Sequence, residues 1–223
     1  MNRLALLGGT FDPIHCGHLD IARAARQALG LDQVWLVPSH VPPHRHPPLA
    51  SAAHRFAMAV LAAQNDTGLL VSDIEMIDTA PSYTSGTLAK IADKGFTGPS
   101  VFFITGADAF REIETWKDFP AILEACHFVV VSRPGVPVAR LRVELPRLSA
   151  RMVDLPGRIP EAPAILLVEA VTADVSSTQV RQKLAEGGTI EGMVPATVAA
   201  YIRKQALYQS QQAPPAQQDH THA

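Results

Sequence analysis

This sequence is poor in cysteine, in long apolar runs and in excess positive charge. Its 223 residues include two cysteines, Cys16 and Cys126, whose spacing indicates neither a disulfide framework nor a zinc ribbon, so we expect a reducing, cytoplasmic compartment. The longest apolar runs, such as residues 164–168 and 128–131, have the length of strands, which argues against a membrane span. The net charge is −2, whereas nucleic-acid binders usually carry a basic face, so we expect neither nucleic acid nor a membrane as a partner.

Short apolar segments alternate with helical patterns along most of the chain. The apolar segments lie at residues 4–7, 34–37, 69–72, 100–105, 128–131 and 164–168, and the helical patterns at 17–29, 51–64, 82–95, 176–186 and from Pro195 onward. This alternation predicts an α/β fold, a Rossmann-like, doubly wound parallel sheet in a single domain of residues 1–208. In such folds ligands bind beyond the carboxyl ends of the strands.

Three further features complete the expectations for the fold. Five prolines interrupt every pattern between residues 136 and 163. Residues 209–223 are rich in Gln, Pro, Ala and His and offer little to bury, so we expect a disordered C-terminal tail. In the helical pattern at 51–64, we expect Phe56, Val60 and Leu61 to face the core.

The most informative segment is Gly-Gly-Thr-Phe-Asp-Pro-Ile-His-Cys-Gly-His at residues 8–18, where a strand passes into a helix. Because they lack a Cβ, Gly8 and Gly9 let the backbone approach a bulky anion, and the following helix offers free N–H groups to a phosphate. His15 and His18 are three residues apart, so they share one side of the helix start and can donate hydrogen bonds to phosphoryl oxygens. A metal-binding pair is the alternative, although no further ligands with convincing spacing accompany it.

A second segment, Val-Ser-Ser-Thr-Gln-Val-Arg at residues 175–181, begins a predicted helix. Its hydroxyl groups could simply cap that helix. Arg181 lies one turn further on, where its guanidinium could bind the same phosphates that the free N–H groups hold.

Two other segments are less specific by themselves. Gly-Ala-Asp at residues 106–108 ends a predicted strand, and Asp108 could bind a ribose hydroxyl or cap the next helix. Trp116, eight residues beyond, could bind a ligand or belong to the core. Pro-Pro-His-Arg at residues 42–45 is a basic loop that could bind a ligand or be an ordinary polyproline connector.

Taken in order, these segments resemble those of bacterial nicotinate mononucleotide adenylyltransferases, members of the HIGH-type nucleotidyltransferase superfamily. The resemblance runs from Leu4 to about Tyr208 and also includes Ser-Tyr-Thr-x-x-Thr-Leu at residues 82–88. The segments at 8–18 and 176–181 mark the superfamily, whereas Ser-Tyr-Thr and Gly-Ala-Asp with Trp116 indicate this enzyme. The family usually has Lys where this chain has Arg45, which keeps the charge but changes its geometry.

The resemblance implies a nucleotidyltransferase domain that transfers the adenylyl group of ATP to nicotinate mononucleotide. The products would be nicotinate adenine dinucleotide and pyrophosphate, in NAD biosynthesis. The implied catalytic residues are His15, His18 and Arg181, which would hold the ATP phosphates. The other implied ATP-binding residues are Gly8, Gly9, Thr10, Gly106, Asp108, Ser177 and Thr178, and the implied mononucleotide-binding residues are His44, Arg45, Tyr83, Thr84 and Trp116. Mg²⁺ is expected to accompany ATP on the grounds of nucleotide chemistry alone, since no carboxylate cluster in the sequence marks a place for it.

Two other functions compete with this one. Within the superfamily, the shared segments would also suit a phosphopantetheine adenylyltransferase. From another class, a nucleotide-binding regulator could keep the fold without the chemistry, although His15, His18 and Arg181 argue against it. No Arg or Lys stands beside residues 82–85, so we expect the free N–H groups at that helix start to receive a nicotinate carboxylate and to favour the acid over the amide.

Overall fold

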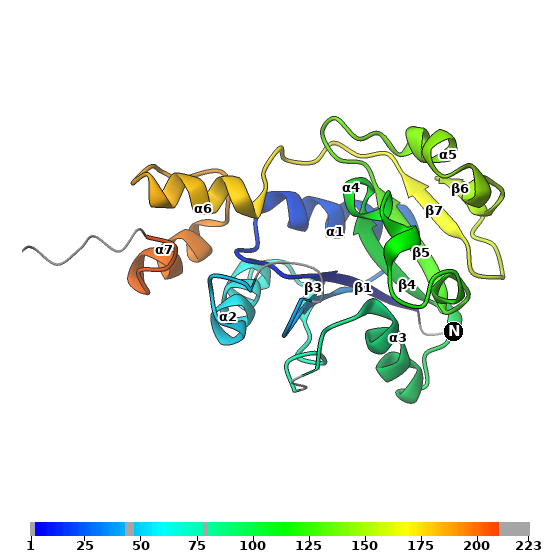
Figure 1. Cartoon of the computed structure of the whole chain (residues 1–223), viewed down its shortest axis with the longest axis horizontal. Coiled ribbons are helices and arrows are strands. Elements are labelled where there is room, and N and C mark those ends of the chain that lie inside the picture. Colours follow the sequence, from blue (N-terminus) through cyan, green and yellow to red (C-terminus); the bar gives the residue numbers. More distant parts are fainter. Residues whose placement is uncertain (1–2, 43–46, 78–79, 210–223) are drawn as a thin grey trace, which may run out of the picture.

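Within the described part of the chain, residues 3–42, 47–77 and 80–209 of a computed structural model, seven parallel strands form one sheet (Figure 1). The strands are β1 (Leu4–Gly9), β2 (Val34–Pro38), β3 (Leu69–Val71), β4 (Gly98–Gly106), β5 (Cys126–Val131), β6 (Met152–Leu155) and β7 (Ile165–Val168). The α-helices are α1 (Cys16–Leu29), α2 (Ala52–Ala63), α3 (Thr84–Asp93), α4 (Ala107–Phe110), α5 (Leu141–Glu144), α6 (Ser177–Ala185) and α7 (Ala196–Lys204). Short 3₁₀ helices are η1 (Ile113–Thr115), η2 (Ala121–Glu124), η3 (Val138–Arg140) and η4 (Pro146–Arg151).

The strand order is β3-β2-β1-β4-β5-β7-β6, and every neighbouring pair is parallel. From β1 the chain winds outward through β2 to β3, then returns to place β4 on the other side of β1. This reversal defines a doubly wound sheet, so the Rossmann-like α/β prediction is confirmed. The loops after β1 and β4 leave the sheet on either side of the reversal, which is where ligands bind in such folds.

The side chains of β1 alternate between two layers of helices. Ala5 and Leu7 belong to the core beneath α1, α2, α6 and α7, whereas Leu4 and Leu6 belong to the core beneath α3 and α4. Figure 1 shows α1 and α3 on opposite sides of the sheet. Because successive strand side chains point to opposite faces, a strand covered on both faces must be apolar at every position.

The predicted inner face of α2 is wrong at Val60, whereas Phe56 and Leu61 are half-buried and Leu61 packs against the core. Val60 is 44% exposed, and the buried positions are instead Arg55, Met58, Ala59, Ala62 and Ala63. Small side chains let the helix approach its neighbours closely, so the alanine face packs inward and the bulkier Val60 faces out. Arg55 can be buried there because its guanidinium finds hydrogen-bond acceptors, as described below.

The proline-rich stretch between residues 136 and 163 contains a strand that no sequence pattern predicted. Strand β6 lies at the edge of the sheet and pairs in parallel with β7, with Met152 opposite Ile165 and Leu155 opposite Val168. Helices α5, η3 and η4 are each six residues or shorter. The prolines therefore limit the length of each element but do not prevent the chain from extending the sheet.

Two further observations concern the length of the helices and the C-terminus. Among the helices of the described residues, none is long and apolar enough to cross a membrane. Gln209 belongs to the described part, whereas residues 210–223 of the predicted tail lie outside it. The domain limit at residue 208 stays a prediction.

Candidate active site

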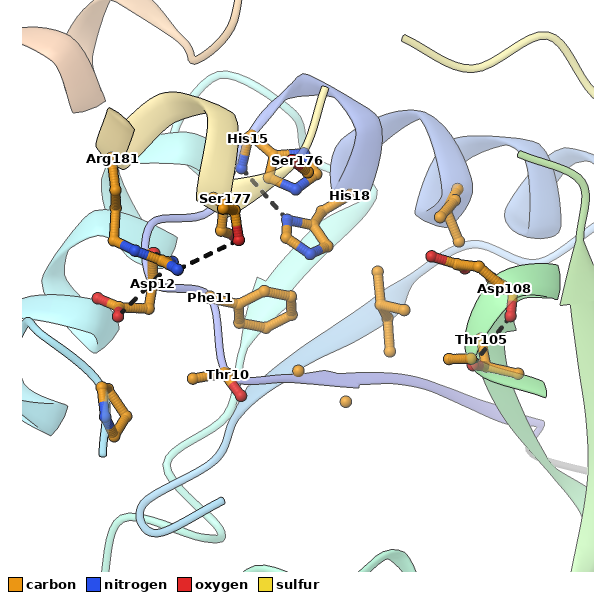
Figure 2. A pocket seen from close by; sticks show the side chains of 18 of the residues that line it. Thr10, Phe11, Asp12, His15, His18, Thr105, Asp108, Ser176, Ser177 and Arg181 are labelled. Atoms are coloured by element: carbon orange, nitrogen blue, oxygen red, sulfur yellow. Dashed lines mark hydrogen bonds and ion pairs between the residues drawn. The ribbon is translucent and has the colours of Figure 1, made fainter. Parts of the chain in front are cut away.

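A cavity of about 1,080 Å³ opens at the carboxyl ends of β1 and β4, where the sheet reverses. Figure 2 shows side chains from the loop after β1, from α1, from the end of β4 and from α6 around this space. Of the predicted ATP-binding residues, the lining contains Gly8, Gly9, Thr10, His15, His18, Gly106, Asp108, Ser177, Thr178 and Arg181. The fold thus brings together all the residues that the sequence assigned to ATP, from segments up to 173 positions apart (Arg181 and Gly8).

The loop after β1 is fixed by its own close packing. A Cβ on Gly9 would lie 2.6 Å from the ring of Phe11, which is far inside van der Waals contact. Phe11 itself has a φ of +52°, a left-handed backbone that is unfavourable for a residue with a Cβ. Its ring is buried and meets His18 edge-on, with ring centroids 4.9 Å apart. The buried Phe11 ring of this loop therefore supports the His18 ring at the start of α1.

The two histidines at the start of α1 stack on each other, with ring centroids 3.7 Å apart. The backbone N–H of His15 donates to Nδ1 of His18 over 3.3 Å, so Nδ1 is an acceptor and carries no hydrogen. In the neutral ring the hydrogen is then on Nε2, which makes the far side of the His18 ring a donor. This bond also satisfies one free N–H group at the helix start.

His15 differs from His18 in its surroundings. It is 3% exposed, and burial together with the nearby Arg133 cation lowers its pKa to about 3. His15 is therefore neutral at pH 7. Its Nδ1 atom has no hydrogen-bond partner among the described residues. A charged His15 would be unfavourable at neutral pH, because a buried imidazolium would lie beside a guanidinium.

Helix α6 contacts the β1 loop directly. The Ser177 hydroxyl donates to the carbonyl of Pro13 over 2.9 Å, and Nη1 of Arg181 donates to the carbonyl of Asp12 over 2.6 Å. Nη2 of Arg181 donates to the Thr178 hydroxyl over 3.2 Å, which holds the guanidinium against the first turn of its own helix. Capping is also present, since the Ser176 hydroxyl accepts from the backbone N–H of Gln179. Ser176 thus caps the helix and also lines the cavity, together with Ser177, Thr178 and Arg181.

Asp12 is a residue of this site that sequence reasoning did not single out. Its carboxylate is 5% exposed and accepts backbone N–H groups from Leu49 and Ala50, at 2.8 and 3.1 Å. It also accepts the Tyr208 hydroxyl at 2.6 Å and lies 3.9 Å from Nη1 of Arg181. One carboxylate therefore connects the β1 loop to the residues before α2, to α6 and to the C-terminal end of the described chain.

Arg55 was also missed, because a lone arginine in a helical pattern gives no signal of burial. Its side chain is 1% exposed and donates to the backbone carbonyls of Thr10, Ser39 and His40, over 2.7, 2.6 and 2.8 Å. Burial lowers the pKa of Arg55, an effect that the neighbouring Asp12 charge partly offsets. Arg55 thereby ties together the carboxyl ends of β1 and β2.

Arg133 is a further residue that the sequence analysis did not single out, and it lines the same cavity. Its Nη2 donates to the carbonyl of Val175 over 2.8 Å, which joins the end of β5 to the residue before the α6 cap. A Cβ on Gly17 would lie 2.4 Å from Nη1 of Arg133. Glycine at position 17 therefore lets the guanidinium lie against the first turn of α1, beside His15.

At the end of β4, Gly106 lies on the floor of the cavity between two unlike side chains. A Cβ at this position would be 3.3 Å from Cγ of Arg133 and 3.4 Å from Cδ1 of Ile21. It would also be 2.5 Å from Oδ1 of Asp108, whose side chain is exposed. A flat apolar group lying over Gly106 would meet Ile21, Arg133 and a carboxylate at its edge.

Of the predicted mononucleotide-binding residues, Tyr83, Thr84 and Trp116 do not line this cavity. His44 and Arg45 lie outside the described residues. Trp116 packs edge-on against Phe103, with ring centroids 6.2 Å apart, and a Cβ on Gly8 would lie 3.0 Å from the same Phe103 ring. Trp116 therefore lies one aromatic ring away from Gly8, on the α3 face of the sheet.

The start of α3 adjoins the end of β2. The Ser82 hydroxyl accepts the backbone N–H of His40 over 3.0 Å, and Tyr83 is the residue before the first turn of α3. Nζ of Lys117 lies 4.6 Å from the centre of the Tyr83 ring. We expected no lysine or arginine beside residues 82–85, and this is wrong for the folded chain. Tertiary folding brings Lys117, which is distant in the sequence, next to Tyr83.

The described residues contain no group of three or more His, Cys, Asp or Glu side chains placed to hold a metal ion together. The carboxylate oxygens of Asp12 already accept hydrogen bonds from the protein. The alternative reading of His15 and His18 as metal ligands has no third ligand within the described ranges.

The switch-point cavity, with a glycine-rich loop at one helix start and hydroxyls and an arginine at another, is the arrangement of a nucleotidyltransferase. The chain belongs to the cytidylyltransferase-like family, whose sequence profile matches residues 6–183.

Similar full-length proteins have a more specific name. One from Roseiflexus sp. (strain RS-1), named "probable nicotinate-nucleotide adenylyltransferase", is 40% identical over 210 residues, which cover 92% of this chain and 97% of the relative. One of the same name from Shewanella pealeana is 37% identical over 207 residues, covering 92% of this chain and 95% of that one. The solved structure of Plasmodium falciparum nicotinic acid mononucleotide adenylyltransferase complexed with NaAD has a TM-score of 0.71 at 18% identity and covers 93% of this chain and 98% of that one. At that identity the structural likeness shows the shared fold.

Proposed function

We propose that this protein is a nicotinate-nucleotide adenylyltransferase, which transfers the adenylyl group of ATP to nicotinate mononucleotide. The observation that carries the proposal is the junction of two distant phosphate-binding segments. Ser177 and Arg181 bond to the carbonyls of Pro13 and Asp12, so both helix starts and the histidines face one cavity. The relatives of the same length support the choice of reaction.

The reaction needs no covalent enzyme intermediate. A phosphate oxygen of the mononucleotide attacks the α-phosphorus of ATP, the bond between that phosphorus and the bridging oxygen to the β-phosphorus breaks, and pyrophosphate leaves with those electrons. The protein must align two anions that repel each other and offset the charge that grows on the leaving group.

The residues of the cavity divide this work. The Nε2–H group of His18 is the donor best suited to the reacting phosphate, because its ring is fixed by the bond at Nδ1. Arg181 and the hydroxyls of Ser177 and Thr178 would hold the β- and γ-phosphates at the start of α6. His15, neutral and buried behind His18, would contribute as an uncharged hydrogen-bonding group.

The opposite side of the cavity suits adenosine. An adenine ring over Gly106 would contact Ile21 on an apolar face and the Arg133 guanidinium, which stacks on aromatic rings. Asp108 at the cavity edge would accept hydrogen bonds from ribose hydroxyls. Gly8, Gly9 and Thr10 complete the wall between the base and the phosphates.

The pyridine ring would bind on the α3 face, between Trp116 and the start of α3. Helix α3 has ten residues and offers free N–H groups at its start, and Lys117 adds a positive charge beside Tyr83. A nicotinate carboxylate satisfies these donors, whereas the NH₂ of an amide would leave buried donors unpaired at a cost of roughly 1–3 kcal/mol. We therefore expect the acid to be preferred by about a hundredfold in kcat/KM.

Magnesium would enter this site as part of the MgATP substrate. The phosphate oxygens would provide most of its ligands, as is usual for an ion that keeps its waters and binds few carboxylates. A cytoplasmic location also stays a prediction.

The test is pyrophosphate release from ATP, with nicotinate mononucleotide, nicotinamide mononucleotide and phosphopantetheine offered separately. Turnover with the nicotinate substrate alone, or at least a hundredfold better, supports the proposal. Equal use of acid and amide contradicts the carboxylate site, and turnover of phosphopantetheine contradicts the pyridine substrate. Trp116→Ala should raise KM for the mononucleotide and leave KM for ATP unchanged, because of the two substrates only the mononucleotide would contact the indole.

A further inference from the structure

Beyond α7, the chain folds back toward the β1 loop through two residues with left-handed backbone. Ala206 has a φ of +49° and Tyr208 a φ of +63°, and the N–H of Leu207 donates to the carbonyl of Ile202 over 3.1 Å. Such backbone is unfavourable for residues with a Cβ and persists where surrounding contacts hold it. The backbone bond of Leu207 closes the end of the helix at Ala206, and the Tyr208 side chain makes a further contact with the β1 loop.

The Tyr208 hydroxyl donates to Oδ1 of Asp12 over 2.6 Å, a short bond to a charged acceptor. Burial and this bond to Asp12 raise the pKa of Tyr208, so the phenol keeps its proton and stays a donor at neutral pH. A residue 196 positions away thus bonds to the carboxylate at the centre of the phosphate loop.

Asp12 in turn determines where the Arg181 guanidinium lies. Nη1 of Arg181 is 2.6 Å from the Asp12 carbonyl and 3.9 Å from its Oδ2. A carboxylate that is fully hydrogen-bonded attracts a neighbouring cation less than one with an open oxygen does. If Tyr208 did not donate, Asp12 would compete more strongly with the ATP phosphates for Arg181.

We propose that Tyr208 is a positioning residue of the ATP site, whose hydroxyl holds Asp12 so that Arg181 is available to the distal phosphates. The inference rests on the proposed function for the identity of the ligand. It does not depend on which mononucleotide is used, because ATP binding can be measured without the second substrate.

The test compares Tyr208→Phe with Tyr201→Phe in the full chain. Tyr201 lies on α7, and its hydroxyl is 2.8 Å from Nδ1 of His54 on α2, so its replacement is a matched control for the loss of one tyrosine hydroxyl. By calorimetric titration, Tyr208→Phe should weaken ATP binding about tenfold, the usual scale for losing one bond to a charged group. Binding of AMP, which has no distal phosphates, should change less than twofold, and the control should bind both nucleotides like the wild type.

A double-mutant cycle tests the route of the effect. In an Arg181→Ala background, Tyr208→Phe should cause no further loss of ATP affinity if Tyr208 acts through Arg181. An additional tenfold loss in that background, equal losses for ATP and AMP, or ATP binding equal to that of Tyr201→Phe would each overturn the inference. A wild-type protein that fails to bind ATP would overturn the proposed function, and the inference with it. Melting temperatures of all variants separate loss of fold from loss of the contact.

Discussion

Replacement of His18 tests the part of the site closest to the chemistry. His18 accepts the backbone N–H of His15 at Nδ1, which leaves Nε2–H as the donor toward the cavity. His18→Ala removes that donor. Loss of one donor aimed at developing charge typically costs about 10²–10³ in kcat, or about 2.7–4 kcal/mol. KM should change little if the donor acts mainly on the transition state.

Two isosteric replacements separate the two ring nitrogens of His18. The side-chain oxygen of His18→Asn can take the place of Nδ1 and accept from His15, but the donor is lost, so kcat should fall as far as in the alanine variant. The longer amide of His18→Gln can place an N–H group near the Nε2 position, and glutamine suits the third position of a helix. We expect His18→Gln to recover at least tenfold in kcat over His18→Ala.

The assay is continuous pyrophosphate release at saturating ATP and nicotinate mononucleotide, with urea unfolding of each variant as the control. A folded His18→Ala variant with near-normal kcat would refute the role of His18. Recovery by asparagine and not by glutamine would show that the bond at Nδ1, rather than the donor at Nε2, matters for turnover.

The other predictions concern three basic residues around the same cavity. Arg181→Ala should raise KM for ATP far more than KM for the mononucleotide. Arg181→Lys should recover only part of the ATP affinity, because the guanidinium that can donate two parallel hydrogen bonds is lost. A rise in KM for the mononucleotide instead would show that Arg181 binds the mononucleotide and not ATP. Arg55→Met should lower the free energy of unfolding in urea by about 3–5 kcal/mol, since three buried carbonyls lose their donors, and a loss below about 1 kcal/mol would contradict that. The pKa of His15 is about 3 in the folded protein and about 6.5 in the unfolded chain, so on acidification the unfolded chain takes up the proton first. Stability should therefore fall as the pH decreases from about 6.5 to about 3. Relative to His15→Asn, the wild type should lose up to about 1.4 kcal/mol per pH unit there, and parallel pH profiles of the two proteins would disprove the shift.

Most of the strands and helices, the doubly wound fold and the segments that line the cavity could be read from the sequence. These features depend on local patterns: an apolar run at residues 4–7 makes a strand buried on both faces, and glycines and histidines follow it directly. Segments 8–18 and 176–181 each carry a signal of their own, and the fold rule that ligands bind at the switch point places them together. Strand β6 was missed because four residues between prolines give too short a pattern.

The partners of individual side chains depended on tertiary structure. Nothing local to Arg55 shows that three carbonyls from two strand ends surround it, and the same is true of Asp12, which collects donors from positions 49, 50 and 208. The protonation of His15 follows from burial and from Arg133, which is 118 positions away in the chain. Lys117 meets Tyr83 only because η1 and the start of α3 lie close together. A sequence specifies hydrogen-bonding groups and charges locally, but their energies depend on distance and desolvation, which only the folded chain determines.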